Sequence, residues 1–148
     1  MEINENFLEG CLFFNTQTFS RTLLRIAEIE FKHLKISPAH ASLLLLVYDS
    51  PGINPKKLSR FLNLSPSTIT RFVDALEKKK LLRRETQGKS THISPSEKGL
   101  EIKEALALAY KQLILKYTGL LGERAVNQLS FTLLTANKKI SEFSDQNE

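Results

Sequence analysis

The chain has 148 residues, of which 41% are hydrophobic and 25% are charged, and its formal net charge is +5. This size and composition predict one globular domain and exclude both wholesale disorder and a large two-domain enzyme. The single cysteine, Cys11, excludes an internal disulfide framework and any metal site built from several cysteines.

The basic residues are concentrated in the middle third of the chain. Residues 54 to 98 contain eleven Lys or Arg against four Asp or Glu (+7), and the rest of the chain contains ten against twelve (−2). This distribution is typical of a module that binds a polyanion, either nucleic acid or anionic lipid. The longest apolar run, residues 43–47, is too short to cross a bilayer, and the acidic N-terminus lacks the basic region of a signal peptide. We therefore expect a cytoplasmic protein with no membrane partner.

Long helical segments are predicted at both ends of the chain. Residues 6–33 carry an apolar stripe at helical spacing and are predicted to form one continuous helix. Near the C-terminus, a long helix is expected to end at Gly119 to Gly122, and a last helix follows it. These stripes offer more apolar surface than one small core can cover, which predicts that two chains bury them together in a homodimer.

Prolines behind Ser or Asn mark the predicted starts of the inner helices. Proline in the first helical turn behind such a cap is favourable, because its ring presets φ and its missing N–H has no helical partner there. We predict helix starts near Ser37, Asn54, Ser65 and Ser94. Residues 37–48 are apolar nearly all round and are expected to be buried centrally. Pro51, in the sequence DSPG, predicts a turn instead.

The helix predicted from Ser65 has one apolar face and one face of small hydroxyls and charges. Its apolar sector comprises Ile69, Phe72, Val73 and Leu76, and the opposite sector comprises Ser67, Arg71, Asp74 and Lys78, with Thr70 on the flank. Short hydroxyl side chains let a helix approach a groove closely, and Arg can fork to guanine O6 and N7. Behind another amphipathic helix and a tight turn, this segment is a predicted helix-turn-helix.

A β-hairpin is predicted directly after this helix. Residues 82–86 and 91–94 flank the turn sequence QGKS and contain β-branched residues. The hairpin makes the motif a winged one, and Lys78 to Lys80 with Arg83 and Arg84 lie where DNA phosphates would neutralise their mutual repulsion. The predicted fold class is mainly α with a small β-hairpin wing: a winged helix-turn-helix core flanked by long N- and C-terminal dimerisation helices.

Residues 35–99, and most specifically LSPSTITRFVDALEKKKLLRR, resemble the core of MarR-family winged helix-turn-helix transcriptional regulators. The resemblance extends to a single MarR-like chain over residues 1–148. It implies a DNA-binding lobe at residues 37–99 and a helical dimerisation region at residues 5–34 and 100–145. It further implies a homodimer that binds double-stranded DNA at a pseudo-palindromic operator, as a repressor that a small-molecule effector relieves.

The residues and the resemblance together give the expected DNA contacts. They are Ser65, Ser67, Thr68, Thr70, Arg71, Lys78, Arg83, Arg84 and Lys89. Two features depart from the family. Lys80 stands where glycine is usual, and a side chain at a left-handed residue costs roughly 1 kcal/mol, so the recognition helix is expected to end differently. Gln87, Gly88 and Lys89 stand where many members carry Asp-Arg-Arg, so the usual wing arginine is missing.

The candidate effector or redox residues are Cys11, Phe14, His40 and Tyr48. Some MarR-like proteins sense oxidants through a cysteine on the first helix, and a thiol-based redox-sensing regulator is one alternative. Cys11 has only apolar and acidic residues nearby, however, so a core or interface position is the favoured interpretation. Phe14 and Tyr48 either line an effector cavity or pack in the core, and His40 is interpreted as a cap or pocket residue.

No enzymatic activity is expected, because the chain has no Ser-His-Asp, paired-carboxylate or glycine-rich phosphate motif. We also expect no metal site and no cofactor. A winged helix that serves as a protein-interaction module within a larger complex is a further alternative.

Overall fold

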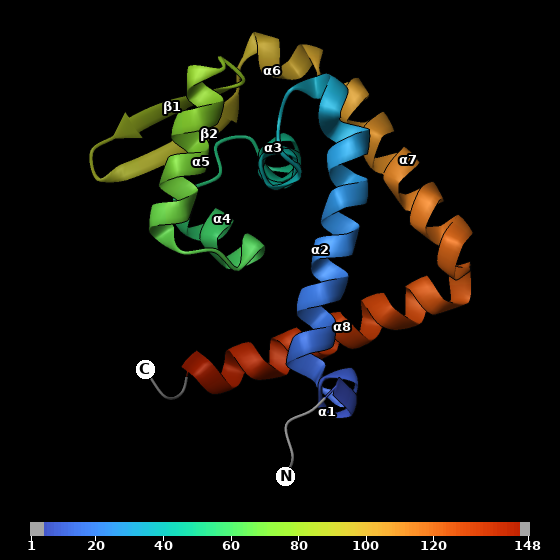
Figure 1. Cartoon of the computed structure of the whole chain (residues 1–148). Coiled ribbons are helices and arrows are strands. Elements are labelled where there is room, and N and C mark those ends of the chain that lie inside the picture. The colour runs from blue at the N-terminus through green and yellow to red at the C-terminus, as the bar shows by residue number, and fades with distance from the viewer. Residues whose placement is uncertain (1–4, 146–148) are drawn as a thin grey trace. The chain divides into compact units, whose positions relative to one another are not determined.

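A computed structural model describes residues 5–145 and is mainly helical with one two-stranded sheet (Figure 1), which confirms the predicted fold class. In chain order the elements are α1 (Glu5–Gly10), α2 (Leu12–Phe31), the 3-10 helix η1 (Lys32–Leu34), α3 (Pro38–Asp49), α4 (Pro55–Leu62), α5 (Pro66–Lys78), β1 (Leu82–Gln87), β2 (Ser90–Pro95), α6 (Glu97–Glu101), α7 (Lys103–Leu121) and α8 (Glu123–Asp145). The chain forms two compact units, the first ending at Tyr110 and the second beginning at Lys111. The first four residues, part of the acidic N-terminus discussed above, lie outside the described range.

Three of the four predicted helix starts are capped as expected. The side-chain oxygens of Ser37, Asn54 and Ser65 each accept a hydrogen bond from a backbone N–H three residues later, at 3.2, 2.8 and 3.2 Å. Each cap is followed by proline at the first helical position. These bonds satisfy N–H groups that have no partner within the helix, so purely local chemistry sets the three starts.

The helix start predicted near Ser94 was wrong. Ser94 lies within β2, where it pairs with Arg83 of β1, and the strand continues to Pro95. The helix begins two residues later, behind Ser96, whose Oγ accepts a hydrogen bond from the N–H of Gly99 at 3.0 Å. The same Ser-Pro pattern that starts a helix elsewhere ends a strand here, because pairing with β1 decides the conformation.

The prediction of one continuous helix over residues 6–33 was also wrong. The helix breaks at Cys11, whose backbone is extended, with φ −84° and ψ 117°. Gly10 directly precedes the break and is the poorest helix former after proline, which explains why α1 ends there. Beyond the break, α2 runs unbroken to Phe31.

The core of the first unit is built around α3. Ala41, Leu43, Leu44 and Val47 of this helix are all 0% exposed, which confirms its predicted central position. The other elements contribute further fully buried side chains, namely Leu58 from α4, Ile69 and Leu76 from α5, Ile93 from β2 and Leu106 from α7. A helix that is apolar all round needs such cover on every side.

The hairpin pairs residues 82–87 with residues 90–95 in antiparallel register, which confirms the predicted wing. Its two-residue loop consists of Gly88, with φ 59°, and Lys89. A tight hairpin loop of this type needs a positive φ at its first residue, which glycine adopts without strain. Ile53, which directly follows the predicted DSPG turn, bridges to Ile93: the N–H of Ile93 donates to the Ile53 carbonyl at 3.0 Å. The loop between α3 and α4 therefore fixes the base of the wing.

The turn that ends α5 is left-handed despite its lysine. Lys80 has φ 62°; its N–H donates to the Glu77 carbonyl at 2.8 Å, and the Leu81 N–H donates to the Leu76 carbonyl at 2.9 Å. This pair of bonds is the Schellman motif that usually ends on glycine. The expectation that the helix would end differently was therefore wrong, because burial of Leu76 and Leu81 holds the turn in place.

Replacing Lys80 by glycine is expected to stabilise the protein. A residue with a side chain costs about 1–2 kcal/mol in the left-handed conformation. Glycine avoids this cost, but its greater freedom in the unfolded chain offsets part of the gain. We expect Lys80→Gly to raise the free energy of unfolding by about 0.5–1 kcal/mol. Urea unfolding measures this difference. Lys80→Ala is the control, because it removes the same charge but keeps Cβ; equal stabilisation by both variants would contradict a backbone origin.

Candidate nucleic-acid interface

The turn between α4 and α5 is fixed by its own hydrogen bonds. Asn63 is left-handed, with φ 50°, and the N–H of Leu64 donates to the Ser59 carbonyl at 3.1 Å. The Ser59 hydroxyl in turn donates to the Leu64 carbonyl at 2.5 Å. Asparagine tolerates the left-handed region better than most residues, so this short link can hold α5 at a defined angle to α4.

The predicted division of α5 into an inner and an outer face is confirmed. Ile69, Val73 and Leu76 are buried, and Phe72 is half-buried. The outer face exposes Ser67, Thr70, Arg71, Asp74 and Lys78. An outer face of this kind presents hydroxyls and one arginine near the helix N-terminus and charges near its C-terminus.

The hydroxyls at the start of α5 form a small hydrogen-bonded cluster. Ser65 Oγ lies 3.1 Å from Ser67 Oγ and 2.9 Å from Thr68 Oγ1, and an Nη2 proton of Arg71 is donated to Thr68 Oγ1 at 3.4 Å. Ser65 and the half-buried Thr68 thus have structural partners, and Thr68 helps to hold Arg71. A guanidinium has five N–H donors, so most of those on Arg71 remain for a ligand.

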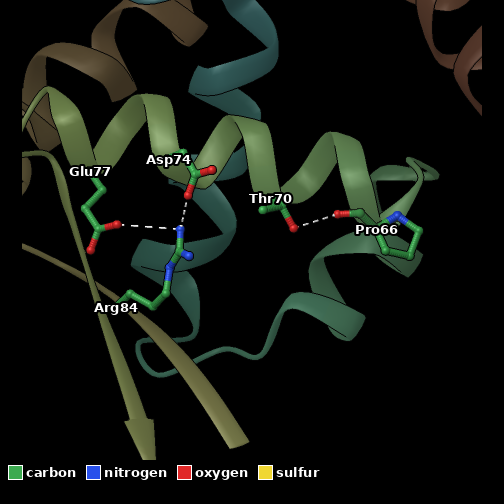
Figure 2. Close-up of polar contacts among 5 residues, drawn as sticks. All are labelled: Pro66, Thr70, Asp74, Glu77 and Arg84. Carbon is green, nitrogen blue, oxygen red and sulfur yellow. Dashed lines mark hydrogen bonds and ion pairs between the residues drawn. The ribbon is translucent and has the colours of Figure 1, made fainter.

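Thr70 donates its hydroxyl proton to the carbonyl of Pro66 at 3.0 Å, one turn earlier on the same helix (Figure 2). The side chain is exposed and borders a cleft between α5 and the wing that is also lined by Arg84 and Thr86. With its proton committed, the Thr70 oxygen is left as a hydrogen-bond acceptor.

Arg84 reaches from β1 back to α5. Its guanidinium forms an ion pair with Asp74 and a second one with Glu77 at 3.5 Å, as Figure 2 shows. The Arg84 side chain is 31% exposed, less than either carboxylate. These two ion pairs link the base of the wing to the outer face of α5. Binding of a phosphate by Arg84, as the sequence predicted, would have to compete with these two acids, and that role stays a prediction.

The remaining predicted phosphate contacts are accessible. Arg83 pairs with Glu85 at 3.5 Å, and both side chains are more than half exposed, so the pair is weak and easily exchanged. Lys78 on α5 and Lys89 at the wing tip are exposed, and neither forms an ion pair with another residue in the described range.

The four candidate effector residues lie on different elements. Cys11 is partly exposed between α1 and α2, and Phe14 follows on α2. The rings of His40 and Phe72 meet edge-on, with their centroids 4.7 Å apart. Burial of the His40 ring, and to a smaller extent the charge of Lys79, lower the pKa of His40. Tyr48 donates its hydroxyl proton to the Gly99 carbonyl at 2.5 Å, and burial raises the pKa of Tyr48. The last two side chains thus have partners in the fold, and an effector role for all four stays a prediction.

Two structural determinants of the site carried no usable sequence signal. Asp74 was expected only as an exposed charge and Glu77 was given no role, and the pairing of both with Arg84 depends on the path of the wing. Gly99 is buried so closely against Leu81 that an added Cβ would lie 2.0 Å from the Leu81 carbonyl oxygen. Both contacts position the end of α5 and the start of the wing.

Within residues 5–145, the side chains of His, Cys, Asp and Glu do not form a group of three or more that could hold a metal ion. None of the helices described there combines the length and apolar character needed to span a membrane.

Part of this chain matches a known protein family. Residues 36–89 match the model of the MarR family. The uncharacterized HTH-type transcriptional regulator YybA of Bacillus subtilis (strain 168) is 29% identical over 86 residues, which make up 56% of this chain. The matched part of the chain spans 57% of that relative's length.

Solved structures of regulators share the fold. The transcriptional regulator SlyA superposes with a TM-score of 0.79 at 23% identity, over 93% of this chain and 99% of that one. The transcriptional repressor CouR bound to a 23-mer DNA duplex gives 0.77 at 23% identity, over 93% and 99%. The S. aureus MepR–DNA complex gives 0.75 at 17% identity, over 89% and 98%. At these identities the likeness is one of fold.

Proposed function

Because this chain is a winged helix-turn-helix protein of the MarR family, we propose that it is a transcriptional regulator that binds double-stranded DNA in a sequence-specific manner. The observation that carries the proposal is the outer face of α5. Ser67, Thr70 and Arg71 lie together near its N-terminus, where a recognition helix meets base edges, and Lys78 lies further along. Arg83 and Lys89 extend the positive charge onto the wing, where it would meet phosphates.

The regulator is proposed to act as a homodimer on a pseudo-palindromic operator in the cytoplasm. Two copies of α5 would enter major grooves about one helical turn apart, roughly 34–36 Å. CouR and MepR have been solved with DNA, which supports DNA as the partner of this fold. Proteins of this chain's fold also bind small molecules: CouR of Rhodococcus jostii RHA1 has been solved with p-coumaroyl-CoA. We therefore propose repression that a small-molecule effector relieves by favouring a different spacing of the two recognition helices.

Titration of the purified protein against its own upstream DNA tests this function. We expect tighter binding than to a shuffled duplex of the same length, and a steep loss of affinity with salt, with a slope of about −0.9 for each phosphate neutralised. A shallow slope without preference over shuffled DNA would contradict the proposal. Stable co-purification with a fixed protein partner, with no retention on a duplex column, would then point to an interaction module.

The dimer is proposed to form through the terminal helices. In α8, no side chain of the described residues is buried, and Leu129 and Leu133, one turn apart on the same face, are 42% and 43% exposed. Side chains of this kind are rarely left in water in such density unless a partner covers them. A second copy supplies the same apolar stripe, as a twofold interface requires.

A charge placed on the apolar stripe of α8 is expected to separate the dimer. Leu133 lies on the stripe, so Leu133→Glu would bury an unpaired carboxylate at the interface, and the mass in solution should fall from that of a dimer to that of a monomer. Light scattering after size-exclusion chromatography measures it. Asn127→Glu is the matched control, because Asn127 is exposed on the opposite side of the same helix. A monomeric parent, or equal loss in both variants, would contradict this interface.

A further inference from the structure

Thr70 on α5 differs from the other hydroxyl residues of this helix in how its proton is used. Its Oγ1 donates to the Pro66 carbonyl at 3.0 Å, one turn earlier on the same helix (Figure 2). Threonine in a helix often forms this bond, because its hydroxyl can reach the carbonyl of the residue four positions before it. The Thr70 hydroxyl therefore meets any ligand with its one proton already committed.

The lone pairs of the Thr70 oxygen receive no hydrogen bond from the protein. Within residues 5–145, no other side chain or backbone N–H donates to Thr70 Oγ1. Arg84 lines the same cleft between α5 and the wing, but its guanidinium is paired with Asp74 and Glu77. The Thr70 side chain is exposed. At this position α5 therefore presents a hydrogen-bond acceptor to a ligand.

The three hydroxyls at the start of α5 are not restricted in this way. Ser65 Oγ lies 3.1 Å from Ser67 Oγ and 2.9 Å from Thr68 Oγ1, and in each pair either oxygen can be the donor. Their protons can be redistributed when a ligand arrives, so the exposed Ser67 can meet either an acceptor or a donor. Of these four hydroxyls, that of Thr70 alone has a fixed role.

An amino group is the part of DNA that suits a fixed acceptor. Phosphate oxygens, guanine O6 and N7, and thymine O4 are themselves acceptors, so a hydrogen bond to any of them would require Thr70 to give up its bond to Pro66. The donors in the major groove are the N6 amino group of adenine and the N4 amino group of cytosine. Either can donate to the Thr70 oxygen while the bond to Pro66 persists.

We propose that Thr70 determines one position of each operator half-site by accepting a hydrogen bond from the amino group of adenine or cytosine. This inference rests on the proposed function and deepens it. Every base pair carries an amino group in the major groove, but always on the base that is adenine or cytosine. Thr70 therefore selects the amino bases A and C over the keto bases G and T on the strand that it faces.

Selection of bound sites from random DNA by the full chain tests the proposal. The parent should enrich A and C over G and T at one position of each half-site, by roughly three- to tenfold, which corresponds to one neutral hydrogen bond. Thr70→Val keeps the shape of the side chain but lacks the oxygen, so this position should lose the preference for A and C. The methyl group that valine adds can contact the thymine methyl, so T can be gained there.

Two matched variants separate the acceptor from other effects of the side chain. Thr70→Ser keeps both the oxygen and a hydroxyl that can bond to the Pro66 carbonyl, so it should retain the preference for A and C. Ser67→Ala removes an exposed hydroxyl three residues earlier on the same helix and should also retain this preference. Both controls leave the oxygen of residue 70 in place, whereas Thr70→Val does not.

Base analogues in the selected duplex give a measurement on the parent that does not depend on how a variant folds. Each adenine is replaced in turn by nebularine and each cytosine by 2-pyrimidinone, which lack the amino group. At the position that Thr70 faces, this change should weaken binding by the parent roughly three- to tenfold more than binding by Thr70→Val. If the base there is adenine, 7-deazaadenine should bind as adenine does, because it keeps the amino group.

The outcomes distinguish a failure of this inference from a failure of the proposed function. A defined operator whose preferences are the same for the parent and Thr70→Val would overturn the role of Thr70 alone. So would a preference for G or T at the position that changes in Thr70→Val, an equal loss in Ser67→Ala, or equal effects of the analogues on the parent and Thr70→Val. Selection of no preferred sequence by the parent would refute both proposals.

Discussion

Gly99→Ala is expected to lower the free energy of unfolding by about 2–4 kcal/mol, a large share of the stability of a domain of this size. The added Cβ would lie 2.0 Å from the Leu81 carbonyl oxygen, and neither the backbone there nor the helix start at Ser96 can yield freely. That carbonyl also accepts a hydrogen bond from the Ser96 N–H at 3.1 Å, and the Ser96 hydroxyl donates to the Lys80 carbonyl at 2.5 Å. The methyl would separate α6 from the corner where α5 meets the wing.

Thermal and urea unfolding measure the loss, with Gly119→Ala as the matched control. Gly119 lies in α7 with nothing within 4 Å of an added Cβ, so alanine there should leave stability unchanged or raise it by up to about 1 kcal/mol. A Gly99→Ala protein as stable as the parent would mean that the corner between α5, β1 and α6 relaxes without cost. In that case the close packing described here would not fix the wing.

Arg71→Ala is expected to cost roughly 1–3 kcal/mol of specific DNA affinity and to relax the sequence preference at the base pairs that Arg71 reads. The side chain is exposed on the outer face of α5 and is held at one donor by Thr68 Oγ1, which limits the freedom it would lose on binding. Affinity for shuffled DNA should change much less, because a base contact is made only at the correct site.

Competition binding on selected and shuffled duplexes at several salt concentrations separates base reading from phosphate binding. Lys78→Gln is the control on the same helix: it should weaken binding to both duplexes about equally and reduce the salt slope by about 1. If Arg71→Ala leaves the ratio of specific to shuffled affinity intact, Arg71 contacts only the backbone, and the specificity must come from other residues of the outer face.

Local patterns explain most of what the sequence predicted correctly. A cap residue followed by proline sets the starts of α3, α4 and α5 through hydrogen bonds spanning three residues. The faces of α5 follow from helical spacing alone, and the wing follows from β-branched residues on either side of a glycine turn. The family resemblance added the expected roles of these elements and rested on the same contiguous segment.

Two of the errors arose where a second element overrode a local signal, whereas the helix break at Cys11 follows from the local effect of Gly10. Ser94 and Pro95 resemble a helix start, but pairing with β1 keeps them in the strand. Lys80 is unfavourable in a left-handed turn, but the buried side chains on both sides of it impose that turn. In each case the energy of tertiary packing exceeds a local preference of about 1 kcal/mol.

The sequence by itself determined the type and order of the inner elements from α3 to β2 and the chemistry on the outer face of α5, because these depend on residues within a few positions of one another. Only the tertiary structure decided the contacts that hold this face in place. Arg84 meets Asp74, Gly99 meets Leu81, and Ile53 meets Ile93. Each contact joins residues at least ten positions apart, so its existence depends on the path of the chain between them, which no short pattern encodes.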